Sequence, residues 1–163
     1  MNFSGHFSAT SDSLNIHLED ASVCNGLDYS GHECKMVIED ASLFIGFQLS
    51  CTNGEVRLSD ASTCKGNFDM QFHLVANLSD ASHLIAFDGT APYAMIKLQD
   101  ASLLNMVQTE VNEMHVDLSG ASEATVNVNG HMEGTLTAAS TLYYKGHPQI
   151  DIDCSEDSQL IPF

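Results

Sequence analysis

The sequence predicts an all-β fold, a right-handed parallel β-helix (β-solenoid) of about seven turns with about 20 residues in each turn. Two observations predict it: a five-residue motif recurs at that period, and apolar residues alternate with polar ones before each copy. A repeat of this length is too short for a pair of helices, which needs about 33 residues or more. It suits a coil of extended chain, and we expect three short strands per turn.

The repeated motif marks the turns. It is first found as Leu18-Glu-Asp-Ala-Ser22, and copies in strict register begin at Ile38, Leu58, Leu78, Leu98 and Leu118. A last copy, Leu136-Thr-Ala-Ala-Ser140, comes two residues early. Seven copies at this spacing predict one turn of the solenoid per copy.

The alternation places the core. Leu14, Ile16 and Leu18 alternate with polar residues, as in a strand with one face inward. After each strict motif, one column is apolar: Cys24, Phe44, Cys64, Leu84, Leu104 and Ala124. The next inward position holds Gly26, Gly46, Gly66 and then Ala86, which predicts tight space there. We expect Phe47 and Phe87, with Phe68 one place displaced, to fill a third side.

The chain is predicted to be a single solenoid domain. Residues 1–10 are expected to form a partial N-terminal coil, residues 11–145 the repeats, and residues 146–163 a C-terminal cap. A cap is expected because an open strand edge invites aggregation.

Charge limits the partners. There are 22 acidic and 5 basic residues, so the formal net charge is −17. Nucleic acid and anionic membrane surfaces are therefore not expected as partners, whereas divalent cations, basic proteins and neutral glycans fit. The basic residues look scattered along the chain. No apolar run approaches the ~20 residues of a membrane-spanning helix.

Two features bear on the compartment. Met1 to Thr10 lacks the basic start and apolar stretch of a signal peptide, which indicates a cytosolic protein or a trimmed chain. The five cysteines are odd in number and have no metal-type spacing. Free thiols are favoured over disulfides, and the compartment stays open.

One acidic column has two interpretations; its members are Asp20, Asp40, Asp60, Asp80 and Asp100. Carboxylates stacked at ~4.8 Å would repel by ~3.5 kcal/mol at an effective dielectric of 20. The favoured interpretation is an Asx-type bend in which each carboxylate accepts backbone N–H bonds. The alternative is a column that binds calcium through shared oxygen ligands. No other cofactor is expected.

A second column consists of the serines that end each motif, Ser22, Ser42, Ser62, Ser82, Ser102, Ser122 and Ser140. Their hydroxyls could pass hydrogen bonds up the ladder, each donating to the next. A nucleophile repeated seven times would be an unusual enzyme. We therefore assign these serines a structural role.

Catalysis is not predicted. Polysaccharide lyases need basic groups beside a cation or acidic cluster, and here Arg57 shares its outward column with a single lysine, Lys97. Glycosidases need two carboxylates ~5–9.5 Å apart in a cleft, which a regular ladder does not provide. The eight histidines fall in different columns.

The outward columns are the better candidates for function. Val37, Leu43, Ile45 and Ile85 could form an exposed apolar strip of the kind that marks a protein contact. Flat solenoid faces bind extended partners or sister molecules through ladders of side chains. The expected partner is therefore a protein or glycan on a flat face, with homo-oligomers as a further option.

Two segments carry a family resemblance. The turn Leu118-Ser-Gly-Ala-Ser-Glu-Ala-Thr-Val-Asn-Val-Asn-Gly130 and the ending Ala139-Ser-Thr-Leu-Tyr-Tyr-Lys-Gly-His-Pro148 resemble the family named putative auto-transporter adhesin, head GIN domain. The resemblance implies a β-solenoid that is exported or associated with the bacterial envelope, and it implies no catalytic residues. Two departures are Asp where the family often has Gly in Ser-Gly-Ala-Ser, and a cysteine content high for an exported protein.

The sequence thus favours a non-enzymatic surface or envelope module that presents side-chain ladders to a protein or glycan. A self-assembling structural scaffold is the alternative. A polysaccharide-acting enzyme on a β-helix ranks third.

Overall fold

The computed structural model describes the backbone of residues 2–163 and the side chains from Ser11 onward. Met1 and the side chains of residues 1–10, where a partial N-terminal coil is predicted, lie outside the described part.

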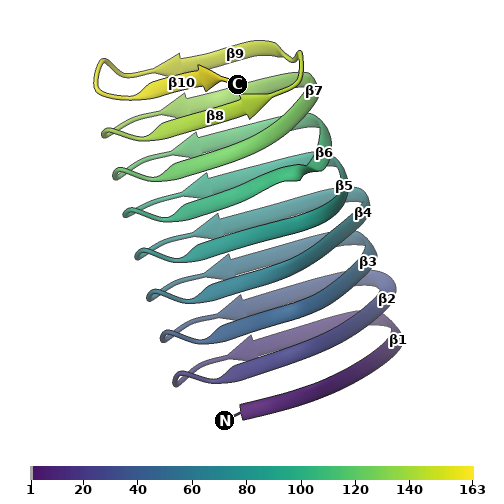
Figure 1. Cartoon of the computed structure of the whole chain (residues 1–163). Coiled ribbons are helices and arrows are strands. Elements are labelled where there is room, and N and C mark those ends of the chain that lie inside the picture. Colours follow the sequence, from purple (N-terminus) through teal and green to yellow (C-terminus); the bar gives the residue numbers. More distant parts are fainter. Residues whose placement is uncertain (1) are drawn as a thin grey trace.

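The chain is a right-handed coil of parallel strands with no helix among residues 2–163, which confirms the predicted fold class (Figure 1). Seven long strands follow one another: β1 (Asn2–Leu18), β2 (Val23–Ile38), β3 (Leu43–Leu58), β4 (Thr63–Leu78), β5 (His83–Leu98), β6 (Leu103–Leu118) and β7 (Glu123–Leu136). Each pairs in parallel with the next. Three short strands complete the last coils: β8 (Thr141–Lys145), β9 (Gln149–Cys154) and β10 (Gln159–Pro162). The total is about eight turns, close to the expected number.

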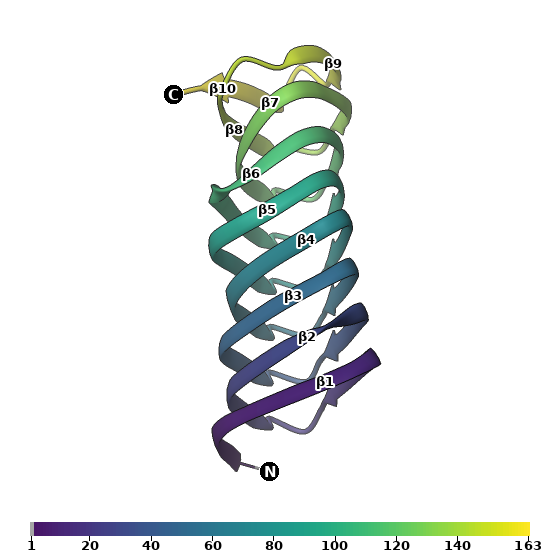
Figure 2. The ribbon, with the colours of Figure 1, turned by 90° about the vertical axis from the view of Figure 1, so that its right-hand side faces the viewer.

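Each full turn differs in one detail from the expectation of three short strands. It is a single strand of 16 residues that passes without interruption through a wide bend (β2 to β6). The flattened coil therefore has two sheet faces, joined by the wide bend on one edge and by a sharp corner on the other (Figure 1). The strand remains continuous because its parallel neighbours bend with it, as the view onto the bend shows (Figure 2).

The sharp corner is a type I′ turn. Asp20 and Ala21 both have left-handed backbone angles, φ 56° and 52°, and the Ser22 N–H donates to the Glu19 carbonyl at 3.2 Å. The Ala21 N–H donates to the Asp40 carbonyl of the next coil at 2.9 Å, so the ladder continues through the corner. The predicted bend position is therefore correct.

The predicted Asx chemistry of that corner is wrong. None of the five corner carboxylates accepts a hydrogen bond within the described part of the chain, and all five are exposed. Aspartate fits here because it tolerates the left-handed conformation better than most residues do.

The apolar columns form the core as predicted. Phe44, Cys64 and the three residues that continue their column are buried, and Cys24 is partly buried. Phe47 and Phe68 are also buried, with their rings 5.0 Å apart. Phe87 is 54% exposed, so its predicted inward position is wrong.

The reason for the exposure of Phe87 is a register shift. Gly66 pairs with Ala86 but Phe68 pairs with Gly89, so β5 carries one extra residue there and Phe87 turns outward. Gly66 itself lies where space is tight, because a Cβ would stand 2.5 Å from the Phe47 ring. Gly46 is exposed and has φ +70°, so backbone conformation rather than space explains that glycine.

The corner serines are buried from Ser42 to Ser140, but among the described residues the hydroxyls from Ser62 onward do not donate to one another as expected. They donate to backbone carbonyls instead: Ser62 Oγ bonds the Ile38 carbonyl at 2.7 Å and Ser140 Oγ bonds the Leu118 carbonyl at 3.2 Å. A carbonyl at a corner has a second lone pair to satisfy, which makes it the better acceptor. The structural role is thus filled by a different hydrogen bond.

The structure also contains a corner at Ser155–Ser158 that does not carry the repeated motif. Ser158 N–H donates to the Ser155 carbonyl at 3.0 Å, and Ser158 Oγ accepts from the Ser140 N–H at 3.2 Å. Ser158 follows Ser140 by 18 residues, the same distance that separates Ser140 from Ser122. The repeat of this 18-residue spacing is the sequence signal that could have predicted the corner.

Candidate binding face

The second half of each long strand, from the wide bend to the corner, builds one flat sheet. We call its outward side chains on β1 to β7 the ladder face. Its three columns follow from the strand register: Ser13, Glu33, Asn53, His73, Tyr93, Glu113 and His131; Asn15, Lys35, Glu55, Val75, Met95, His115 and Glu133; His17, Val37, Arg57, Asn77, Lys97, Asp117 and Thr135. In Figure 1 the sheet that carries the ladder face is formed by the fainter, more distant halves of the strands, which end in arrowheads.

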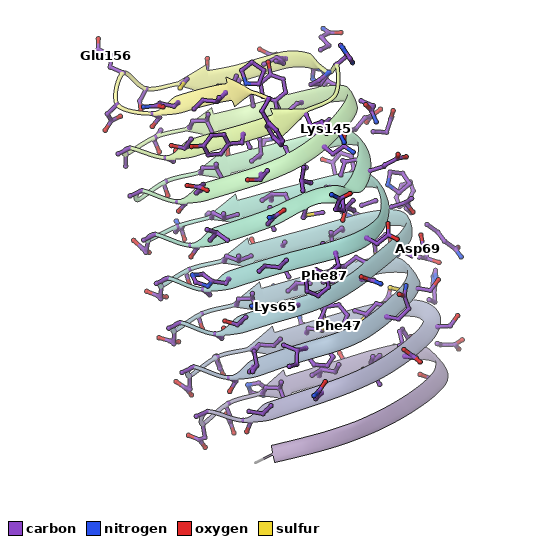
Figure 3. All side chains as sticks on the ribbon, in the orientation of Figure 1. Phe47, Lys65, Asp69, Phe87, Lys145 and Glu156 are labelled. Carbon is purple, nitrogen blue, oxygen red and sulfur yellow. The ribbon has the colours of Figure 1, made fainter. Side chains whose placement is uncertain are left out.

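The ladder face holds three of the five basic residues, Lys35, Arg57 and Lys97. Lys65 lies on the opposite sheet and Lys145 near the end of β8 (Figure 3). The cations are therefore less scattered than they look in the sequence.

Glu55 connects two of those cations. Lys35 Nζ lies 3.2 Å from Glu55 Oε2, and Arg57 Nε donates to Glu55 Oε1. Partial burial acts to raise the pKa of Glu55, but the hydrogen bonds from Lys35 and Arg57 outweigh it and lower the pKa below its ordinary value. Lys97 makes no ion pair within the described residues, so its ammonium stays available to a ligand.

Two shallow depressions lie side by side over these residues. Both are lined by Lys35, Arg57 and Asn77; the first extends to His73 and the second to Lys97. His73 packs its ring on Tyr93 with centroids 4.9 Å apart, and its Nε2 is buried without a hydrogen-bond partner in the described chain. A buried imidazole nitrogen without a partner costs free energy.

The C-terminal end of the ladder face is a network of imidazoles and carboxylates. His115 Nε2 lies 3.2 Å from Asp117 Oδ2 and its Nδ1 3.3 Å from Glu133 Oε1. His131 Nε2 lies 3.6 Å from Glu133 Oε2. Burial acts to raise the pKa of Asp117, but hydrogen bonds from Thr135 and His115 outweigh it and lower that pKa.

The expected apolar strip does not form as one surface. Val37 lies on the ladder face, whereas Leu43, Ile45 and Ile85 lie on the opposite sheet, and all four are partly buried. All four side chains point outward as the alternation predicts, but the corner between Val37 and Leu43 puts these two residues on different sheets. The exposed large apolar side chains among the described residues are Phe72, Phe87, Met95, Ile150 and Phe163.

The wide bend has a polar surface of its own. A shallow depression there is lined by side chains that include Gln48, Asn67, Asp69 and Thr90. Thr90 Oγ1 donates to Asp69 Oδ1 at 2.6 Å, and Asn67 Nδ2 donates to Gln48 Oε1 at 2.9 Å. These side chains bond to one another across neighbouring coils, which leaves them less free for a ligand than the ladder face.

The aspartate column, Asp20, Asp40, Asp60, Asp80 and Asp100, lies along the exposed corner edge, one residue per coil. The turn geometry accounts for these positions without a cation. Calcium binding by the column stays a prediction.

No helix in the described part of the chain is long and apolar enough to cross a membrane. Comparison with curated proteins and with solved structures finds no match. Comparison with family profiles finds one over residues 9–148, described as putative auto-transporter adhesin, head GIN domain.

Proposed function

Because the chain belongs to the family of putative auto-transporter adhesin, head GIN domains, we propose that it is a non-enzymatic adhesion module of the cell surface or envelope. In this proposal it binds an extended protein or glycan along the ladder face. The family description supports both the binding role and export. The β-solenoid fold supports a flat, repetitive binding surface.

The observation that carries the proposal is the pair of adjoining depressions over Lys35, Arg57 and Asn77. On a chain of formal charge −17, this is where basic side chains gather. The parallel register fixes their spacing, so they meet a ligand with little loss of backbone freedom. Lys97, which has no ion pair within the described residues, favours a ligand that carries acidic groups.

The depressions also favour an extended ligand over a small one. They are open toward solvent and run along neighbouring coils, whereas pockets for small molecules enclose most of their ligand. This shape supports adhesion rather than turnover of a small substrate.

A binding screen with matched charge variants tests the proposal. The chain is screened on a glycan array and used as bait in a pull-down of envelope proteins. The affinity of each hit is then measured for the parent and for the double variant Arg57→Ala/Lys97→Ala. We expect at least a tenfold loss of affinity, because two charge-assisted contacts are removed. The control Lys65→Ala/Lys145→Ala has the same change of net charge on other surfaces and should change affinity less than about twofold.

Two outcomes would contradict the proposal. Equal losses in both double variants would mean that binding follows net charge rather than the ladder face. No hit in either screen, together with self-association that rises with concentration, would favour the structural scaffold instead. Fractionation of cells that express the full gene product tests the export part separately.

A further inference from the structure

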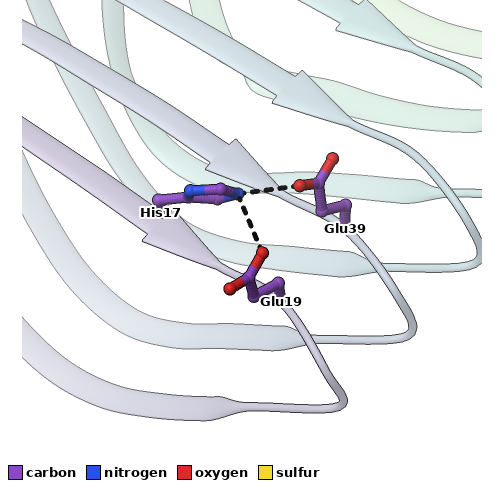
Figure 4. Close-up of side chains that lie close together, drawn as sticks. All are labelled: His17, Glu19 and Glu39. Carbon is purple, nitrogen blue, oxygen red and sulfur yellow. Dashed lines mark hydrogen bonds and ion pairs between the residues drawn. The ribbon is translucent and has the colours of Figure 1, made fainter.

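We propose that His17, Glu19 and Glu39 form a binding site for one divalent transition-metal ion of the Zn²⁺ class. The three side chains meet at the corner end of the ladder face, between the first two coils (Figure 4). The site adjoins the second depression, which Glu39 also lines, whereas His17 and Glu19 line neither depression. The zinc measurements below do not depend on the adhesion proposal.

The donor atoms are close enough for one ion. His17 Nε2 lies 2.7 Å from Glu39 Oε1 and 3.8 Å from Glu19 Oε2, and one ligand atom from each residue falls within 4.8 Å of the others. Zinc binds nitrogen and oxygen ligands at about 2.0–2.2 Å, so ligands of a tetrahedral ion lie about 3.4 Å apart. Rotations of the exposed side chains can bring the donor atoms from their present distances to those of a tetrahedral site. Water completes the coordination.

The backbone holds the three residues in place. Glu19 and Glu39 occupy equivalent positions in successive coils, and the Glu39 N–H donates to the Leu18 carbonyl at 2.9 Å. His17 precedes Glu19 by two residues, so alternation puts both on the same face. The later coils have neutral residues at the glutamate position, beginning with Ser59 and Ser79, so the combination is confined to the first two coils.

The local charge favours a cation. Asp20 and Asp40 are the next residues after the two glutamates, and the ion pairs of both glutamates within the described chain are with His17 alone. The imidazole of His17 thus lies within electrostatic reach of three of these carboxylates, those of Glu19, Glu39 and Asp40. Imidazole with carboxylates suits zinc, cobalt, nickel or copper, whereas calcium prefers oxygen ligands throughout, which separates this site from the predicted calcium column.

Isothermal titration with ZnCl₂ tests the site on the whole chain. The parent is Cys154→Ser, because Cys154 is exposed and a thiolate would compete for zinc. We expect one ion per chain, a loss of at least tenfold in affinity for His17→Ala and for Glu39→Gln, and a change below twofold for His83→Ala, an exposed histidine on the opposite sheet. The three substituted residues, His17, Glu39 and His83, are exposed or partly exposed, so the variants should fold.

A second measurement separates this site from the His115 network. Zinc should raise the melting temperature of the parent and of His115→Ala, but not of His17→Ala, because the ion joins two coils only when the site is intact. The inference is overturned if the parent binds no zinc up to millimolar concentration. It is also overturned if His17→Ala and Glu39→Gln bind as the parent does, or if the loss follows His115→Ala.

Discussion

The chain reverses direction twice in each coil, at the sharp corner and at the wide bend, and the two reversals are built differently. At the corner, two left-handed residues and a buried serine form the same turn in coil after coil, and the strands from β2 to β6 pair there with one constant sequence spacing. At the bend that spacing varies: it is shorter between Cys51 and its partner Met70, and longer between Phe68 and its partner Gly89. It shifts again in the bend between β6 and β7.

This difference shows what the sequence repeat encodes. A type I′ turn accepts few residue types at its two left-handed positions, so the motif must recur wherever the chain makes that turn. A bent strand accepts almost any residue, because its hydrogen bonds run to the neighbouring coils and not within the bend. The corner is therefore repeated from coil to coil within this chain, and the bend is free to vary.

The largest expected effect tests whether the variable bend is nonetheless well packed inside. Phe68→Ala at the bend should lower the free energy of unfolding by about 3–5 kcal/mol, as much as Phe44→Ala on the corner side, because both rings are buried. Phe87→Ala should cost less than about 0.5 kcal/mol, because that ring is exposed. Urea denaturation measures all three. A cost below about 2 kcal/mol for Phe68→Ala would mean a loosely packed bend.

A single inserted glycine compares the two reversals directly. Placed after Ala61, it breaks the Ser62-to-Ser59 turn bond and the Ala61 bond to the Asp80 carbonyl, and it displaces the buried Ser62. We expect a cost of about 3 kcal/mol. Placed after Gln71, where the register already shifts, it should cost about 1 kcal/mol or less.

Urea denaturation measures the difference in unfolding free energy between the two insertions from their midpoints. This holds if the dependence of that free energy on urea concentration is the same in both variants. Equal costs at both positions would show that the bend is as constrained as the corner.

A smaller effect is expected from serine substitutions. Ser62→Ala removes the bond to the Ile38 carbonyl, which still accepts the Ser59 N–H at 3.2 Å, so the expected cost is about 1 kcal/mol. Ser50→Ala, in the bend and partly buried, should change stability by less than about 0.5 kcal/mol. Thermal melts of both variants provide the test, and a larger effect at Ser50 would reverse the comparison.

The smallest effect concerns local opening, which thiol labelling can report. All five cysteines are free; burial raises the pKa of Cys51 to about 11 and that of Cys64 well above its ordinary value, while Cys154 is exposed. At pH 8 Cys154 should react first. Cys51 at the bend should then react about tenfold faster than Cys64 beside the corner, since the irregular bend opens at lower free energy.

Timed labelling followed by peptide mass spectrometry gives these rates, and labelling in urea gives the unfolded reference. Faster reaction of Cys64 than of Cys51 would contradict the greater openness of the bend.

The predictability of the fold follows the same division. The coil length, the corner position and the core column of Phe44 and Cys64 could be predicted, because corner chemistry and alternation fix residue types. The outward turn of Phe87 could not, because it depends on a one-residue register shift that leaves no mark on local sequence. The chain was also expected to use three strands per turn, since nothing in the sequence shows that a strand continues through the bend.

The candidate site was only partly accessible from sequence. The aspartate column stood out, yet its residues serve the turn. Arg57 follows Lys35 by 22 residues, one coil plus one step of alternation, which is the signal that puts both on one face. His17 and Glu39 have the same spacing. That His73 Nε2 has no hydrogen-bond partner among the described residues depends on how the ring packs against Tyr93, which no spacing in the sequence shows.

The constant register at the corner has a consequence for how such a molecule can evolve. Since the corners of β2 to β6 pair at the same spacing, removal or duplication of one whole coil leaves two matching edges in contact. The coil, rather than the residue, is then the natural unit of gain and loss. Recombination between copies of the corner motif can lengthen or shorten the ladder face while every remaining turn keeps its geometry.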